Sequence, residues 1–186
     1  MKRYISIIFA AMAVTACLEP IHRNDNLYDS SVYMINSGIT STPAMYDCQT
    51  KADYNVYTYC GGFYGGAPEV SVSVDASALE NYNAENFTSY KALPSDCYKL
   101  DANRKKMEDK KATFTLTFDV DALKNLSTKE DYSDLDSMVV PLRIHSLTEG
   151  ITDARDDKNN VSLVIPYLKQ MSFVFDEEGS DFITYD

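Results

Sequence analysis

The 186-residue sequence predicts an all-β sandwich of about seven or eight short strands with one short helix inserted. Three observations favour this class. The segments "EVSVSVD" (69–75) and "ATFTLTFDV" (112–120) alternate apolar and hydroxyl-bearing residues, as strands with one buried and one wet face do. Turn-forming residues interrupt the apolar runs at short intervals. Apolar residues make up 45% of the chain, which is enough to close a core.

The strand candidates follow one another along most of the chain. Each is a short run rich in β-branched or aromatic residues, bounded by polar or glycine-containing turns. Besides the two segments above, they are "VYMIN" (32–36), "TPAMYDCQT" (42–50), "DYNVYTYC" (53–60), "SMVVPLRIHS" (137–146), "VSLVIPYL" (161–168) and a last run from "MSFVF" (171–175). Pro141 and Pro166 lie inside two of these runs. Because proline cannot donate to a ladder, we expect those strands at sheet edges or bulged there.

The inserted helix is expected in "DASALENYNAENF" (75–87). Ser77 and Glu80 have the spacing of a capping box, and Leu79 and Tyr82 recur at helical spacing toward a core. We expect about two helical turns, lying across an end of the sheets. Two further local features are a short helical turn in "DALKNLST" and a hairpin whose turn lies at 109–111.

The first residues predict an exported, lipid-anchored protein. Lys2 and Arg3 precede the uncharged run "YISIIFAAMAV", which is shorter than the roughly 20 helical residues that cross a bilayer. Cys17 then follows in "VTAC", which resembles the bacterial lipobox, where the thiol receives a diacylglycerol and the chain is cut before the cysteine. We therefore expect a lipoprotein signal peptide at 1–16, lipidation of Cys17 and a tether at 17–31. The alternative is an ordinary signal peptide with a chance cysteine.

The charge of the mature chain excludes one class of partner. Without Lys2 and Arg3, 15 basic residues stand against 28 acidic ones, a net charge of −13. Such a surface repels nucleic acid and anionic lipid headgroups, so we expect no nucleic-acid binding. The length suits one β-sandwich domain at 32–169, followed by a C-terminal strand and acidic tail at 170–186.

Three cysteines remain after the first: Cys48, Cys60 and Cys97. An odd number in an exported protein leaves at least one thiol unpaired. Cys48 and Cys60 could face each other across a hairpin, or all three could be small buried apolar residues, the reading we favour. No Cys/His spacing indicates zinc, and we expect neither a metal nor a cofactor.

Four segments together resemble an uncharacterised N-terminal domain of surface lipoproteins from gut Bacteroidetes. They are "VSVSVDASALENYN", "YKALPSDCYKL", "ATFTLTFDVDAL" and "VVPLRIHS". In that family a strand ends in Val-Asp, a Leu-x-x-Tyr-Asn helix follows, Tyr-x-x-Leu-Pro leads into the next strand, and a late strand carries Pro-Leu. The matching positions, in a resemblance that spans 32–168, are Val74, Asp75, Leu79, Tyr82, Asn83, Tyr90, Leu93, Pro94, Tyr98, Pro141 and Leu142.

The resemblance implies an immunoglobulin-like β-sandwich at the start of an exported lipoprotein of polysaccharide-uptake systems. It implies attachment to the outer membrane, on the periplasmic or cell-surface face, and a polysaccharide or a partner surface lipoprotein as possible partners. In the family a second module, lectin-like or glycosidase, usually follows. In this sequence that module would begin near "MSFVF", shortly before Asp186, which puts glycan hydrolysis in doubt. We expect a non-catalytic protein.

The sequence offers few other candidates for catalysis or metal binding. Histidines occur only at His22 and His145, and no triad can be built around them, so His145 is expected to be structural or on the surface. No pair of carboxylates stands in a recognisable glycosidase setting. Asp153, Asp156 and Asp157 could supply oxygen ligands to calcium, but their spacing is not that of an EF-hand, and a solvated turn is the better interpretation.

The aromatic segment "YNVYTYCGGFYGG" is the best candidate for binding. Sugar rings present an apolar C–H face that stacks on aromatic rings, and polar neighbours can bind the hydroxyl groups. We name Tyr57, Tyr59, Phe63 and Tyr64 as candidate ligand-binding residues. In the alternative, Tyr57 or Tyr59 fills the core and the glycines only turn the chain. For the whole protein, the alternative is a structural or adhesive module that acts by strand pairing through "MSFVF".

Overall fold

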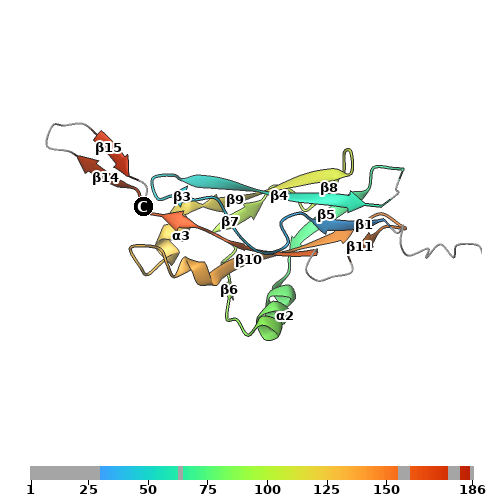
Figure 1. Cartoon of the computed structure of the whole chain (residues 1–186), viewed down its shortest axis with the longest axis horizontal. Helices are drawn as coiled ribbons and strands as arrows, with labels where there is room; N and C mark the ends of the chain where they lie inside the picture. Colours follow the sequence, from blue (N-terminus) through green and yellow to red (C-terminus); the bar gives the residue numbers. More distant parts are fainter. Residues whose placement is uncertain (1–29, 63–64, 155–159, 176–180, 185–186) are drawn as a thin grey trace, which may run out of the picture.

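The computed structural model describes residues 30–62, 65–154, 160–175 and 181–184. They form two main β-sheets packed face to face, with one helix outside them (Figure 1). Sheet A has the order β11 (Thr152–Asp153), β1 (Ser31–Met34), β4 (Lys51–Gly61), β9 (Lys111–Asp119) and β7 (Tyr98–Leu100). Sheet B has the order β2 (Gly38–Ser41), β12 (Val161–Ile165), β10 (Met138–Ser146), β5 (Glu69–Val74) and β8 (Arg104–Lys106). The predicted β-sandwich is confirmed.

Short elements complete the fold. β6 (Lys91–Ala92) adds to one end of β10, and β3 (Met45–Tyr46) pairs with β13 (Leu168–Lys169). β14 (Ser172–Phe175) pairs with β15 (Asp181–Thr184). The helices are α2 (Ala76–Asn86), α3 (Val120–Leu126) and a 3-10 turn, η2 (Leu135–Ser137). The expected strand count was low because several of these two- to four-residue strands are set by their partners and carry little pattern of their own.

The core lies between the inner faces of the two sheets. Phe114, Leu116 and Phe118 of β9 meet Leu142 and Ile144 of β10 there, and all five are fully buried. On β9 each of these residues alternates with an outward threonine, as the sequence predicted. Residues 51–59 of β4 run antiparallel to the whole of β9, which fixes the inward and outward faces of both strands together.

The helix α2 is longer than expected and lies elsewhere. It covers the outer face of sheet B, where Leu79 packs on Val161 and Leu163 of β12. Its cap is Asp75, whose carboxylate accepts hydrogen bonds from the backbone N–H groups of Ser77 (3.0 Å) and Ala78 (3.3 Å). The predicted cap at Ser77 was therefore wrong by two residues, because aspartate accepts these bonds as well as serine does.

Pro141 was expected at an edge or a bulge, yet it lies in β10, a central strand paired to both β12 and β5. The physical reason is a gap in the pairing. β5 pairs with β10 only from Leu142 onward, and β6 only with Met138 and Val139. Between these two strands, Asp75 donates its backbone N–H to the Pro141 carbonyl, and as the N-cap of α2 it directs its own carbonyl to the helix, so the N–H group that proline lacks is not needed there. Pro166 follows the last residue of β12.

The turn at 109–111 is present, but it is not a simple hairpin. Asp109 and Lys110 adopt positive φ angles of 47° and 64° in a tight turn. β8 before the turn belongs to sheet B and β9 after it belongs to sheet A. The segment is therefore a corner between the two sheets, which local sequence cannot distinguish from a hairpin.

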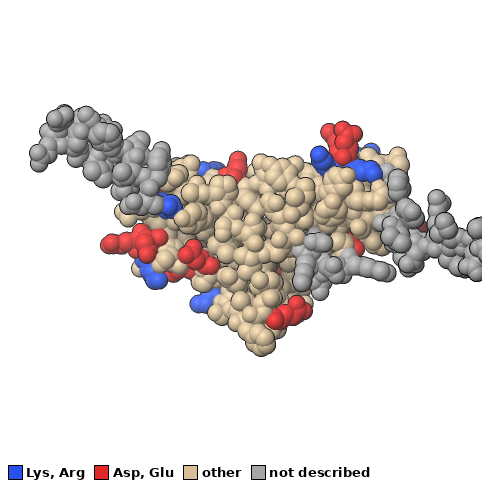
Figure 2. Space-filling view, in the orientation of Figure 1, with Lys and Arg blue, Asp and Glu red and all other residues tan. Residues whose placement is uncertain are grey.

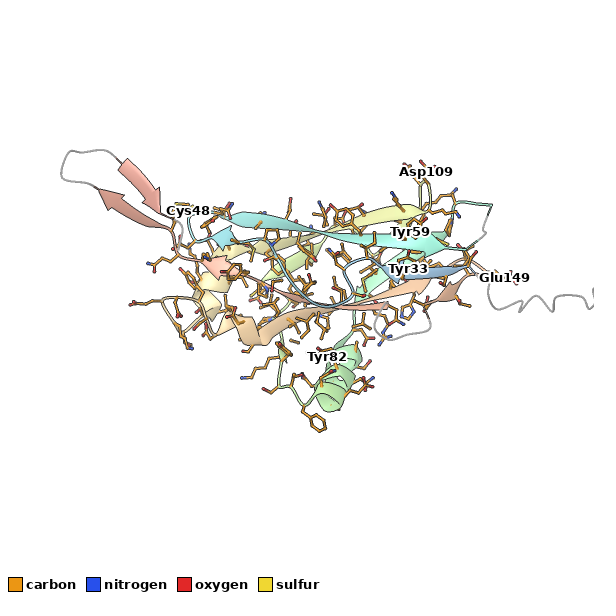
Figure 3. All side chains as sticks on the ribbon, in the orientation of Figure 1. Tyr33, Cys48, Tyr59, Tyr82, Asp109 and Glu149 are labelled. Atoms are coloured by element: carbon orange, nitrogen blue, oxygen red, sulfur yellow. The ribbon has the colours of Figure 1, made fainter. Side chains whose placement is uncertain are left out.

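The cysteines of the described part are all free thiols. Cys48 precedes β4, Cys60 lies near the other end of that strand, and Figure 3 shows Cys48 far from Tyr59, the neighbour of Cys60. A strand rises about 3.3 Å per residue, so the pairing considered from sequence is impossible. Cys60 and Cys97 are buried as expected, but Cys48 is exposed. Burial raises the pKa of Cys60, and it raises that of Cys97 to about 11.

The predicted signal peptide, Cys17 and nearly all of the tether at 17–31 lie outside the described residues. Among the residues that are described, no helix combines the length and apolar character needed to cross a bilayer.

Candidate functional site

The first candidate surface is the outer face of sheet A. β4 alternates strictly, so Tyr54 and Val56 point into the core while Asn55, Tyr57 and Tyr59 point outward. The two predicted tyrosines therefore share one face, two residues apart. They are not core-filling residues, because Tyr57 is 44% exposed and Tyr59 is half-buried.

β1 adds a third ring that the sequence reading did not include. Tyr33 is the register partner of Tyr59, and their ring centroids are 5.5 Å apart with planes tilted by 58° (Figure 3). Burial raises the pKa of Tyr33, and the neighbouring Tyr59 raises it further, so the Tyr33 hydroxyl stays protonated at neutral pH. We call Tyr33, Tyr57 and Tyr59 the tyrosine face.

Hydrogen-bonding groups continue this face on β9. Thr113 is the register partner of Tyr57, and Thr115 is that of Asn55. The Thr115 hydroxyl lies 3.3 Å from Asn55 Oδ1, to which it donates. An aromatic strip beside a row of hydroxyl and amide groups can stack against the apolar face of a sugar and bind its hydroxyls.

Two of the predicted residues cannot be placed. Phe63 and Tyr64 lie outside the described residues, so the tyrosine face consists of Tyr57 and Tyr59 from the prediction together with Tyr33. Tyr33 could have been found in the sequence, because "VYMIN" alternates and places Tyr33 opposite to the apolar Val32 and Met34.

The second candidate is a cavity of about 420 Å³ between α2 and the outer face of sheet B, here called the α2 groove. Sites for small molecules commonly measure about 300–1,000 Å³. The helix contributes an aromatic ring and polar groups through Asn81, Tyr82, Glu85 and Asn86. These residues share a face because they are spaced four apart in two pairs.

The opposite wall of the α2 groove belongs to sheet B. Val161 and Leu163 of β12 form an apolar surface, and Arg143 of β10 supplies a cation. The Arg143 Nε donates to the Asp75 carboxylate at the helix cap. The pKa of Asp75 is lowered to about 2, chiefly by the hydrogen bond from the Ser77 hydroxyl and in part by Arg143. The carboxylate is therefore ionised at neutral pH.

Sequence reading missed the α2 groove because its walls come from distant segments. The signal available was limited to the spacing of Asn81 with Glu85 and of Tyr82 with Asn86 on one helix. Nothing local shows that β12 lies opposite this face.

Other candidate chemistry is sparse. His145 is exposed, and its Nδ1 lies 2.7 Å from Asp153 Oδ2, so it is a surface residue as expected. Of the three aspartates considered for calcium, only Asp153 lies in the described part, since 155–159 fall outside it. Within the described ranges, no three His, Cys, Asp or Glu side chains are grouped so that they could hold a metal ion.

Solved structures of Bacteroides proteins share this fold. A Bacteroides ovatus protein of unknown function matches 87% of this chain and 55% of its own, at 15% identity and a TM-score of 0.59. A candidate carbohydrate binding protein from B. ovatus matches 79% of this chain and 43% of its own, at 18% identity and a TM-score of 0.52. A multidomain B. ovatus protein that includes DUF1735 matches 82% of this chain and 55% of its own, at 15% identity and a TM-score of 0.51.

The chain thus spans about half the length of these structures. At such identities the likeness shows the shared fold. No curated protein matches the sequence. A family model described as a "-like, N-terminal domain" matches residues 28–151, which is most of the chain. The chain therefore belongs to this family of N-terminal domains, as its strand and helix motifs implied.

Proposed function

We propose that this chain is a non-catalytic, lipid-anchored surface module that binds glycan along the tyrosine face. The observation that carries the proposal is the arrangement of Tyr33, Tyr57 and Tyr59 on the outer side of sheet A, beside the hydroxyl and amide groups of β4 and β9. The described elements leave this face open to solvent, whereas α2 covers the corresponding face of sheet B.

The ligand class follows from the chemistry of the face. Tyr57 and Tyr59 project from the same side of one strand, about 7 Å apart, so an extended chain can lie across both rings. Because the whole chain is strongly acidic, a neutral polysaccharide is favoured over a polyanionic one. The carbohydrate-binding description of one structural neighbour supports the same class.

A glycan array tests the proposal. The described residues begin at Ser30 and the predicted lipidation site is Cys17, so residues 18–186 can be produced without the lipid and applied to the array. We expect binding to one or more neutral polysaccharides. Tyr57→Ala and Tyr59→Ala should each weaken it, while Tyr167→Ala, which removes a comparably exposed tyrosine elsewhere, should not. Absence of binding across the array would refute the glycan-binding function.

Attachment through Cys17 is a separate part of the proposal. Each buried methylene contributes about 0.8 kcal/mol, so two or three acyl chains would hold the chain on a membrane. In cells fed labelled palmitate, we expect label on the wild-type chain and none on Cys17→Ala, which should also leave the membrane fraction. Equal membrane association of both would contradict lipid anchoring.

A second candidate function is protein interaction through the C-terminal hairpin. One edge of β14 is occupied by β15, so free strand exchange through "MSFVF" gains no support. The hairpin bonds to neither main sheet among the described strands, and an isolated two-stranded hairpin is only marginally stable. Packing against another module would stabilise it. Protection of β14 amides from hydrogen exchange only in the presence of a partner surface lipoprotein would favour this function.

A further inference from the structure

We infer that the α2 groove is a second, independent binding site, and that its ligand is a short neutral sugar. The groove and the tyrosine face belong to different sheets, so one chain could hold two parts of a glycan or two separate glycans. The inference stands on the lining of the cavity, its charge and the way its walls are fixed.

The lining offers the two kinds of contact that sugars use. Tyr82 is half-buried and packs beside Tyr90, with ring centroids 6.5 Å apart, so its ring is held in place. Together with Leu163 it gives the cavity an apolar, partly aromatic surface. Asn81 is exposed at the rim, and no hydrogen bond to its side chain is found among the described residues. A free amide can both donate to and accept from sugar hydroxyls.

The charges of the groove select against anions. Arg143 is 18% exposed and is paired with Asp75, so its positive charge is already balanced. Glu85 at the rim then leaves the groove with one net negative charge. Figure 2 shows acidic side chains on the visible side of α2, at the lower edge of the molecule. A uronate or a sulfated sugar would be repelled, whereas a neutral sugar can donate hydroxyl hydrogen bonds to the Glu85 carboxylate.

Both walls of the groove are fixed before any ligand arrives. The start of α2 is held to sheet B by the Asp75–Arg143 ion pair. Its last turn is held by Asn83, whose side chain donates to the Tyr90 carbonyl at 2.9 Å and accepts from the Tyr90 N–H at 3.1 Å. Binding therefore requires little ordering of the protein, which favours affinity for a small ligand.

Phe87, the residue that ends α2, has a backbone conformation that is costly for phenylalanine. Phe87 comes directly after Asn86, a lining residue, and ends α2 in the left-handed region with a φ of 55°. Its side chain is 96% exposed. Both features disfavour phenylalanine here, where glycine is usual. Phe87 does not itself line the α2 groove, so this conformation bears on the stability of α2 and not on the binding site.

Nuclear magnetic resonance of the side-chain amides of Asn81 and Asn86 tests the inference. The probes are methyl α-mannoside, galactose and N-acetylglucosamine, with galacturonate as the charged counterpart of galactose. We expect at least one neutral probe to shift both amide signals and galacturonate to shift neither. Failure of every neutral probe to shift them, well above millimolar concentration, would overturn the inference. Equal shifts by galacturonate would overturn the neutral-sugar assignment.

Matched variants separate this site from folding defects and from the tyrosine face. Glu85→Ala should weaken the neutral probe about tenfold, the effect of losing one hydrogen bond to a charged group. Glu80→Ala removes another exposed carboxylate of α2 that does not line the groove, and it should bind as the wild type does. Tyr57→Ala should also leave the groove titration unchanged. Equal weakening by Glu85→Ala and Glu80→Ala would contradict the site.

Discussion

The outer faces of the two sheets differ in how far other elements cover them. In sheet A, β9 alternates buried apolar residues with outward threonines, and its outer face stays open. In sheet B, every residue of β12 is buried, because α2 covers the outer side. An open face can present a flat aromatic surface, while a covered face can present a groove where the cover is incomplete. Sheet A therefore carries the proposed surface for an extended glycan, and sheet B carries the cavity beneath α2.

The difference also accounts for what could be predicted from sequence. Strict alternation in "EVSVSVD" and "ATFTLTFDV" identifies strands with one buried face, and both are strands in the structure. "VSLVI" has apolar residues on both sides, which a strand shows only when a further layer covers it. The α2 helix was predicted, but its position over β12 was not, since its capping and spacing carry no information about its partner. Two members of the tyrosine face, Tyr57 and Tyr59, were named from the aromatic segment of the sequence, whereas Tyr33 joins them only through the pairing of β1 with β4, and the α2 groove likewise needed a three-dimensional contact.

The largest effect should come from the core that both sheets share. Phe114 is fully buried between them, so Phe114→Ala removes its contacts and leaves a cavity. We expect a loss of about 3–5 kcal/mol in the free energy of unfolding, measured by urea denaturation. Thr113→Ala, on the exposed side of the same strand, should change it by less than about 0.5 kcal/mol. Similar losses for the two variants would contradict the assigned faces of β9.

The second largest loss of stability is expected at the face of sheet B that α2 covers. Leu163 is fully buried beneath α2, and Leu163→Ala should cost about 2–4 kcal/mol. Hydrogen exchange should quicken in α2 more than in β4 and β9, since the removed contacts join the helix to β12. Uniform quickening across both sheets would show that the helix is not a separate layer.

Asp75 links the helix cap to sheet B, and its effect depends on pH. The pKa of Asp75 in the folded chain is about 2, below the usual value of 3.8. Its contribution to the stability of the fold is therefore fully present above about pH 3.8 and is lost as the pH falls through about 2. We expect Asp75→Asn to cost about 2 kcal/mol at pH 7 and to flatten the fall of stability between about pH 5 and 2.

The matched control for this variant is Glu80→Gln, which should leave both the stability and its pH dependence nearly unchanged. Asp134 also has a pKa lowered to about 2, chiefly through the Ser127 hydroxyl, so some slope should remain in Asp75→Asn. An unchanged slope in Asp75→Asn would contradict the lowered pKa of Asp75, to which the Ser77 hydroxyl and then Arg143 contribute.

A smaller effect of opposite sign is expected at the end of α2. Phe87→Gly removes the strain of a left-handed phenylalanine and should raise the free energy of unfolding by about 1 kcal/mol. Phe87→Ala keeps a Cβ atom in the same conformation and should give little or no gain. If alanine stabilised the protein as much as glycine, backbone strain would not be the cause.

Glycan binding along the tyrosine face can be measured as the affinity of the chain for polysaccharide. Electrophoresis through gels containing a neutral polysaccharide that the wild-type chain binds measures this as retardation. We expect Tyr57→Ala to lose most of the retardation while its free energy of unfolding changes by less than about 0.5 kcal/mol, and we expect Tyr167→Ala to keep both the retardation and the stability of the wild type. Undiminished retardation of Tyr57→Ala would contradict binding along the tyrosine face.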